Sequence, residues 1–209
     1  RAAISSNEIK LLLEAIQQVP KHKKEKLPLQ RVVQILKRHR DMLFNGNEHK
    51  PISIIITTLA SKAYNKETDI IEALINVVND MENHIEERWS DEHGKVIKWI
   101  SNPVNDEENF ADKWQEYPQR ETNFYDWLSE VKKDLNNILG QSGKGLQFIN
   151  ESMVKPFGKD AVTKAFSSYG EKYLKQRESG AMKMAAGTGM LGETGRTSVP
   201  QHKPFGKNE

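Results

Sequence analysis

Apolar residues along most of this chain recur every three to four positions, which is the spacing of an amphipathic helix. This spacing predicts helices over residues 5–19, from residue 28 to about residue 43, and over residues 67–85, 120–139, 145–154 and 159–176. Ser5 with Glu8 three residues later forms a capping-box signature, and Pro20 ends the first helix. Pro28 suits the first turn of the second helix. We therefore expect a mainly α fold organised as a helical bundle.

The most apolar stretch of the chain covers residues 52–63 and follows a polar turn. Its β-branched residues would suit a strand. Its length, its ending in LASKAY and the helices on either side favour a buried helix instead. Ser53 stands at its head, where the hydroxyl either caps the helix or is offered to a ligand, and the sequence leaves both interpretations open.

Residues 86–105 break the helical spacing and predict a short β-ribbon or an extended segment. Asn105 followed by Glu108 is a helix-start signature, so a further helix is expected there. Asp106, Glu107 and Glu108 would then be first-turn charges favoured by the helix dipole. The tryptophans are expected in the core, and these are Trp89, Trp99, Trp114 and Trp127.

The composition changes after Ser179. The last 31 residues hold six glycines and two prolines, too little apolar surface to offset the entropy of ordering. We expect a helical lobe over residues 1–178 and a Gly-rich extended tail over residues 179–209, either flexible or docked on a surface. The tail contains a literal G-x-G-x-x-G from Gly187 to Gly192, but a dinucleotide site needs a strand before it and a helix after it, and neither is expected.

Charge and cysteine content exclude several classes of site. Net charge is only +2 over 209 residues, so no overall basic field would recruit nucleic acid. The chain has no cysteine, which excludes disulfides and thiolate zinc sites and fits a cytoplasmic protein. No apolar stretch reaches the roughly 20 residues that span a bilayer, so no membrane contact is expected. His84 and His93 have acidic neighbours, which indicates a solvated acidic turn rather than a metal site.

The second predicted helix carries a basic face opposite its apolar one. The apolar positions are Leu29, Val32, Val33, Leu36 and Leu43. Lys37 lies on the other face, about one turn from Arg40. A solvated basic face explains this spacing, and a contact to phosphate or to a nucleobase is the alternative, since an ammonium can donate hydrogen bonds to both.

Four segments together carry a family resemblance: VVQILKRHR, ISIIITTLASKAY, NPVNDEENFADKW and NFYDWL. They resemble the C-terminal helical half of bacterial cGAS/DncV-like nucleotidyltransferases, the CD-NTases, and the tail ESGAMKMAAGTGMLGETG…HKPFG resembles the tail of many members. The resemblance implies the helical lobe of a two-lobed enzyme whose other lobe is polymerase-β-like. It implies an activity that joins NTPs such as ATP into cyclic di- or trinucleotides, second messengers that activate an effector in anti-phage defence.

The resemblance also implies nucleotide-binding residues. Lys37 matches the family's nucleotide-contacting lysine and Ser53 its helix-leading serine, with Arg38 and Arg40 as nearby basic groups. In cGAS and oligoadenylate synthase an aromatic residue follows the serine, whereas Ile54 follows it here. The turn Asn102-Pro103-Val104-Asn105 matches a family turn whose role is mainly structural.

One departure from the family limits the expected activity. We find no Gly-Ser followed by Asp-x-Asp, so we expect no catalytic or metal-binding residue in this chain, and we expect it to be one half of the enzyme. Mg²⁺ would be bound by the missing N-terminal lobe, and the partners would be NTPs, that lobe and, through the tail, proteins of an effector operon. The alternative is a non-catalytic interaction module whose tail docks on or is conjugated to a partner. A nucleic-acid sensor is disfavoured by the near-zero net charge and the lack of cysteine.

Overall fold

The computed structural model describes residues 6–15, 27–184, 191–192 and 197–199, and all structural statements refer to these residues. The described chain is mainly helical. The helices are α1 (Ser6–Ala15), α2 (Pro28–Phe44), α3 (Ser53–Ala63), α4 (Ile70–Asp80), the 3₁₀ turn η1 (Met81–His84), α5 (Lys113–Glu116), α6 (Pro118–Leu139), α7 (Leu146–Phe157) and α8 (Lys159–Glu178). The strands are β1 (Glu86–Ser90), β2 (Lys95–Trp99), β3 (Ser101–Asn102), β4 (Asn105–Asn109), β5 (Lys183–Met184), β6 (Leu191–Gly192) and β7 (Thr197–Ser198).

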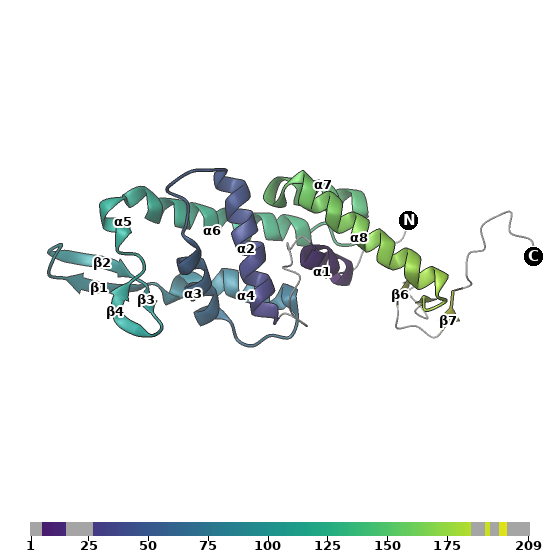
Figure 1. Ribbon diagram of the computed structural model, residues 1–209, viewed down its shortest axis with the longest axis horizontal. Helices are drawn as coiled ribbons and strands as arrows, with labels where there is room; N and C mark the ends of the chain where they lie inside the picture. The colour runs from purple at the N-terminus through teal and green to yellow at the C-terminus, as the bar shows by residue number, and fades with distance from the viewer. Residues whose placement is uncertain (1–5, 16–26, 185–190, 193–196, 200–209) are drawn as a thin grey trace, which may run out of the picture.

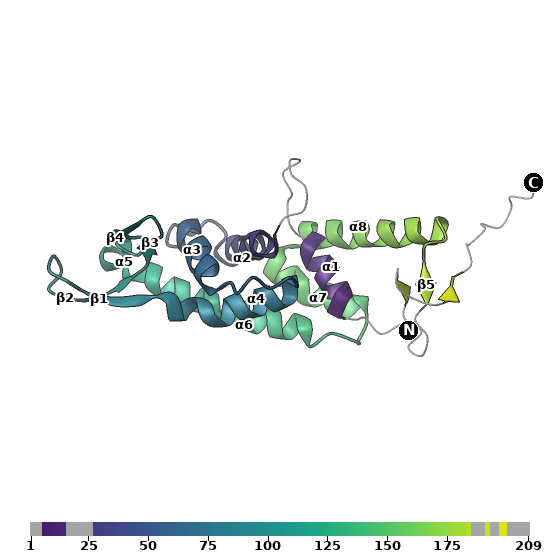
Figure 2. The same cartoon turned by 90° about the horizontal axis from the view of Figure 1, so that it is seen from below.

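The molecule is elongated, and α6 runs along much of its length (Figure 1). Helices α2, α3 and α4 pack together beside α6, while the β1–β2 hairpin extends from one end. Toward the other end α8 packs on both α1 and α7 (Figure 2). A single cluster of buried apolar side chains joins all of these helices, so the bundle has one continuous core.

The predicted helices are confirmed because their apolar faces form this core. On α6 the apolar residues that recur at helical spacing are all buried, namely Phe124, Trp127, Leu128, Val131, Leu135 and Ile138. Residues 53–63 form a helix rather than a strand, as predicted. Helix α4 begins at Ile70 because Asp69 caps it, its carboxylate accepting hydrogen bonds from the backbone N–H groups of Ile71 and Glu72. Ser5 and residues 16–20, with the predicted cap and end of the first helix, lie outside the described residues.

The predicted helix start at Asn105 is wrong, because Asn105–Asn109 is strand β4, paired antiparallel with β3. Two of the carboxylates expected in a first helical turn contact side chains instead. Asp106 pairs with Arg88 of β1 at 3.1 Å, and Glu108 accepts a hydrogen bond from the Asn102 amide at 2.6 Å. The predicted β-ribbon over residues 86–105 is confirmed, with β1 and β2 forming a regular hairpin.

Two apolar side chains expected in the core are exposed. Trp89 is 64% exposed on the hairpin, and Leu43 is 40% exposed near the end of α2. Trp99 is only half-buried and lies under the Arg88 guanidinium, 4.9 Å from its ring centroid. Trp114 and Trp127 are buried as predicted.

Helix α8 ends at Glu178, next to the predicted start of the tail. The described part of the tail forms a small antiparallel sheet in the order β6-β5-β7. Most of the G-x-G-x-x-G segment and the last ten residues lie outside the described residues, so the flexible or docked tail stays a prediction. None of the described helices combines the length and the apolarity that crossing a bilayer would need.

Candidate functional site at the junction of α2 and α3

Arg40, in the last third of α2, ties this helix to the head of α3. Its side chain is buried, with an exposed fraction of 6%. Nη1 donates to the Pro51 carbonyl at 3.1 Å and to Ser53 Oγ at 2.9 Å. Nε and Nη2 donate to Oδ1 of Asp41 at 3.0 and 2.8 Å. The guanidinium therefore holds the end of the α2–α3 connection and the first residue of α3 in one arrangement.

Ser53 is exposed and occupies the first helical position of α3, after the N-cap residue Ile52. The N-cap position belongs to Ile52, so Ser53 does not occupy the cap position that one interpretation of the sequence gave it. The Ser53 oxygen instead accepts the hydrogen bond from Arg40. A hydroxyl also carries one proton to donate. No acceptor for the Ser53 proton is found within the described parts of the chain, so this donor remains available at the surface.

Asp41 binds the Arg40 guanidinium and is itself bound by Lys50. The Lys50 ammonium donates to Asp41 Oδ1 at 3.1 Å, the oxygen that also accepts from Arg40. Burial tends to raise the pKa of Asp41, but the hydrogen bonds from Lys50 and Arg40 outweigh burial and the pKa is lowered. Asp41 therefore stays ionised and cancels only part of the positive charge around it.

Lys37 lies one turn before Arg40 and Asp41 on the same side of α2, since residues three and four apart are neighbours on a helix. Its pKa is lowered, first by burial and then by the charge of Arg40, while Asp41 acts in the opposite direction. Within the described residues its ammonium has no hydrogen-bond or ion-pair partner. We call Lys37, Arg40, Asp41, Lys50 and Ser53 the α2–α3 cluster. Three cations and one carboxylate give it a net positive charge.

Arg38, the fourth residue predicted to contact nucleotide, points to a different part of the bundle. Its Nε donates to the Phe157 carbonyl at 2.9 Å, at the end of α7. The structure thus bonds Arg40 to Ser53, with Lys37 one turn before Arg40 on α2, and places Arg38 at the α7–α8 corner. Sequence reasoning missed Asp41 and Lys50 as members of the site. Their local signal was weak, an acidic residue directly after Arg40 and a lysine directly before Pro51.

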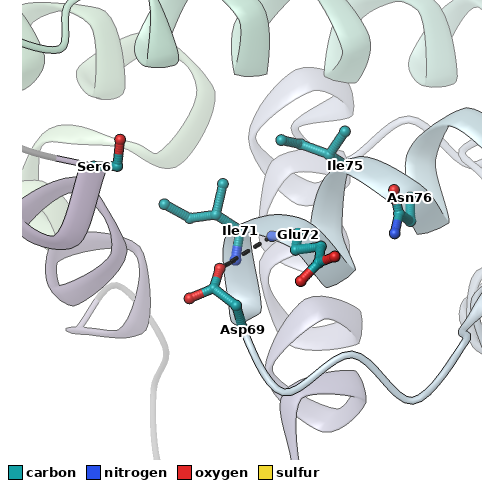
Figure 3. A pocket seen from close by; sticks show the side chains of 6 residues that line it. All are labelled: Ser6, Asp69, Ile71, Glu72, Ile75 and Asn76. Atoms are coloured by element: carbon teal, nitrogen blue, oxygen red, sulfur yellow. Dashed lines mark hydrogen bonds between the residues drawn. The ribbon is translucent and has the colours of Figure 1, made fainter.

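A separate pocket of about 410 Å³ lies between α1 and α4 (Figure 3). It is lined by Ser6, Asp69, Ile71, Glu72, Ile75 and Asn76. Asp69 is already engaged there, because it caps α4 and pairs with Lys10 at 2.6 Å. The pocket contains no residue of the α2–α3 cluster.

The described residues do not fit a magnesium site. No group of three or more histidine or acidic side chains lies together in the described ranges in a way that could hold a metal ion. His84 instead pairs with Asp80 four residues earlier, at 2.9 Å. His93 lies exposed in the turn between β1 and β2.

Comparison with known proteins finds similarity both in sequence and in structure. No protein-family model matches the chain. The chain is 30% identical over 177 residues to a c-di-GMP synthase of Roseivirga ehrenbergii. It is also similar in structure to the CD-NTase CdnG of Bradyrhizobium diazoefficiens in complex with GTP, with a TM-score of 0.51, 20% identity and 68% of this chain covered. The resemblance to the CD-NTases is confirmed.

The match covers only part of each of these two proteins. The sequence match includes 84% of this chain and 45% of the Roseivirga protein. The structural match includes 40% of the Bradyrhizobium protein. The chain therefore spans about half the length of the curated relative. The expected fold class, a mainly α bundle like that found within a CD-NTase, is confirmed by the structural match.

Proposed function

We propose that this CD-NTase-like chain is the C-terminal helical lobe of a cyclic oligonucleotide synthase and that the α2–α3 cluster contacts the bound NTP. The observation that carries the proposal is that two unused donors, the Lys37 ammonium and the Ser53 hydroxyl, each neighbour the buried Arg40. The similarity to a c-di-GMP synthase and to a GTP-bound CD-NTase supports nucleotide as the ligand. GTP is accordingly the first substrate to test, with ATP as the comparison.

Each residue of the cluster has a chemical role in this proposal. Lys37 donates to a phosphate oxygen or to a base acceptor and neutralises negative charge. Ser53 donates to the base. Arg40 and Lys50 add positive potential without leaving their partners. Phosphoryl transfer depends largely on positioning and charge neutralisation, which a lobe closing over the triphosphate can supply.

The chemical step would be completed by a second lobe, equivalent to the portion of the Roseivirga relative that lies outside the match. A pair of Mg²⁺ ions would be held by several carboxylates and would stabilise negative charge on the reacting oxygens, and the described residues offer no such group of carboxylates. We therefore propose that a catalytic nucleotidyltransferase lobe binds Mg²⁺ and that the helical lobe holds base and phosphates. The product would be a cyclic di- or trinucleotide acting as a second messenger in anti-phage defence.

The proposal is tested with the full-length protein that contains this chain. GTP affinity and the yield of cyclic nucleotide are measured for the wild type and for Lys37→Ala. Loss of the ammonium should weaken GTP binding and lower the yield. Lys133→Ala, which removes an exposed lysine on α6, is the matched control and should change neither. If Lys37→Ala binds GTP and forms product like the wild type, the cluster is not the nucleotide contact.

A further inference from the structure

The turn that follows α2 contains the pair Asn45-Gly46, a combination found nowhere else in the sequence. The Asn47 N–H donates to the Phe44 carbonyl at 2.8 Å and closes this turn. Asn45 and Gly46, at its centre, both have positive φ, of 31° and 92°. A type I′ turn has such a geometry, and Asn-Gly is a preferred sequence for it because both residues tolerate positive φ. The turn explains why the pair is present, and the pair also has a reactivity of its own.

The reacting atoms of this pair are open to solvent. Asn45 and Gly46 are both exposed. Apart from the neighbouring residues of the chain, no atom lies within 4 Å of the position that a Cβ would take at Gly46. Within the described residues, neither the Asn45 side-chain amide nor the Gly46 N–H makes a hydrogen bond. Glycine also lacks a side chain that would crowd its own nitrogen, so the Gly46 nitrogen can approach the Asn45 amide carbon when the turn relaxes.

Asparagine is one of the thermolabile residues, and its reaction here needs only water. The Gly46 nitrogen loses its proton to solvent and bonds to the Asn45 amide carbon, which closes a succinimide ring. The bond from that carbon to the side-chain nitrogen breaks, and the nitrogen takes a proton from water and leaves as ammonia. Water then adds to one of the ring carbonyls and opens the ring. Opening on one side gives aspartate, and opening on the other gives isoaspartate, in which the backbone runs through the former side chain.

We infer that Asn45-Gly46 is a site of spontaneous deamidation in the folded protein and that its isoaspartyl product loosens the connection between α2 and α3. Isoaspartate adds one carbon to the backbone of the turn, so the hydrogen bond from Asn47 to Phe44 loses its geometry. Asn45 is also the C-cap residue of α2. The reaction places a carboxylate there, where the helix dipole disfavours negative charge.

The turn begins the connection that supplies partners to the α2–α3 cluster. On this connection the Lys50 ammonium binds Asp41, and the Pro51 carbonyl accepts from Arg40. A loosened turn would therefore weaken the hold of the connection on the end of α2. The inference follows from the turn itself and does not depend on the proposed function.

The test follows the full-length protein during storage in mildly alkaline buffer, where the Gly46 nitrogen loses its proton more readily. Trypsin cleaves after Arg40, and mass spectrometry of the peptide that follows detects the mass gained when an amide becomes a carboxylate. Chromatography separates the aspartyl and isoaspartyl forms, which have equal mass. We expect Asn45 to convert into both forms, and to convert more slowly in mildly acid buffer.

Two other asparagines are internal controls in the same sample. Asn47 lies in the same peptide, and its Oδ1 accepts a hydrogen bond from the His49 N–H at 2.8 Å. Asn65 is exposed and precedes Lys66, whose φ is also positive but whose side chain crowds the attacking nitrogen. Both should stay intact while Asn45 reacts.

Two variants separate the effect of the charge from that of the longer backbone. Asn45→Gln should not react during storage, because its longer side chain would have to close a larger ring. Asn45→Asp, freshly prepared, carries the new charge without the additional backbone carbon. In urea denaturation we expect the isoaspartyl fraction of the stored wild type to be less stable than fresh wild type and than Asn45→Asp. Stored Asn45→Gln should be as stable as the fresh variant.

The outcomes decide the two halves of the inference. If Asn45 stays intact in the folded protein for as long as Asn65 does, or converts only in urea, the modification site is overturned. If Asn45 converts but the isoaspartyl fraction unfolds like fresh wild type, the site stands and its effect on the α2–α3 connection is overturned.

Discussion

His39 on α2 and Asp134 on α6 form a buried pair, with His39 Nε2 3.0 Å from Asp134 Oδ2. The histidine is only 3% exposed and its ring packs edge-on against Phe157 of α7. Its second nitrogen, Nδ1, is buried and has no hydrogen-bond partner among the residues the structure describes. A protonated ring would leave a charged N–H unpaired in the core, so the neutral ring, donating through Nε2, suits this site better.

The first prediction is a loss of stability in mild acid that depends on His39. Burial lowers the pKa of His39 below its ordinary value of 6.5, although the hydrogen bond and charge of Asp134 oppose this effect. Below pH 6.5 the unfolded chain binds this proton more readily than the folded one. The stability that is present above this pH is therefore lost as the pH falls through the folded-state pKa. A tenfold difference in proton affinity between the folded and unfolded chains corresponds to about 1.4 kcal/mol of stability.

The measurement is the free energy of unfolding in urea at about pH 8 and about pH 5. His39→Gln keeps a donor for Asp134 and cannot bind a proton in this range, so its stability should fall less between the two conditions. His93→Gln removes an exposed histidine from the β1–β2 turn and controls for the loss of one histidine. Equal acid losses in the wild type and in His39→Gln would show that His39 is not the sensitive group.

A second prediction concerns Gly158, between α7 and α8. Its φ of +84° and ψ of 143° lie in a region that is open almost only to glycine. A Cβ atom there would lie 3.0 Å from Nη2 of Arg38 and from the thioether of Met42. We expect Gly158→Ala to lower the free energy of unfolding by about 2 kcal/mol, measured by urea denaturation.

The control for Gly158 is another glycine with the opposite expectation. Gly170 lies inside α8 and has open space around the position of a Cβ atom. Gly170→Ala should stabilise the protein by about 0.5–1 kcal/mol, because alanine loses less backbone entropy in a helix. If both substitutions stabilise the protein, the backbone conformation at Gly158 does not require glycine, and the prediction is wrong.

A third prediction concerns the contact between α1 and α8. The Tyr169 hydroxyl donates to Glu8 at 2.8 Å, and burial raises the pKa of Tyr169, so the hydroxyl keeps its proton. Tyr169→Phe should lower the free energy of unfolding by about 1–2 kcal/mol, since the acceptor is a carboxylate. Tyr125→Phe is the matched control, because no hydrogen bond of the Tyr125 hydroxyl is found in the described ranges. Equal effects of the two substitutions would contradict a role for the Glu8 contact.

The helices could be predicted from the sequence because residues that are buried on one face of a helix recur every three to four positions. The six inward residues of α6 and the helical state of residues 53–63 follow from such spacing. Strand β4 could not be predicted in this way. Asn105 and Glu108 have the spacing of a helix start, whereas the segment is held as a strand by its pairing with β3 and by the ion pair between Asp106 and Arg88, 18 residues apart. Contacts of that range leave no local pattern in one sequence.

The candidate site could be predicted only in part. Lys37 and Ser53 follow from the family resemblance; Ser53 begins α3, and Lys37 lies on α2 one turn before Arg40. The burial of Arg40 and its hydrogen bond to Ser53 depend on the path of the α2–α3 connection. The pattern of residues along α2 does not predict that path. The same limit explains Arg38, adjacent to Lys37 in sequence but bonded to Phe157, 119 residues away.

The last prediction is a pH dependence of nucleotide binding that belongs to Lys37. Burial and then the Arg40 charge lower the pKa of Lys37 below 10.5. Raising the pH from about 7 to about 9.5 should therefore remove its charge earlier than for an ordinary lysine, and GTP affinity should fall. In Lys37→Arg the guanidinium stays charged, so affinity should fall less over the same range. Titration of GTP itself affects both proteins alike and cancels in the comparison, while Lys133→Arg controls for a lysine-to-arginine change elsewhere. Parallel pH profiles for the wild type and Lys37→Arg would mean that the Lys37 ammonium does not contact the nucleotide.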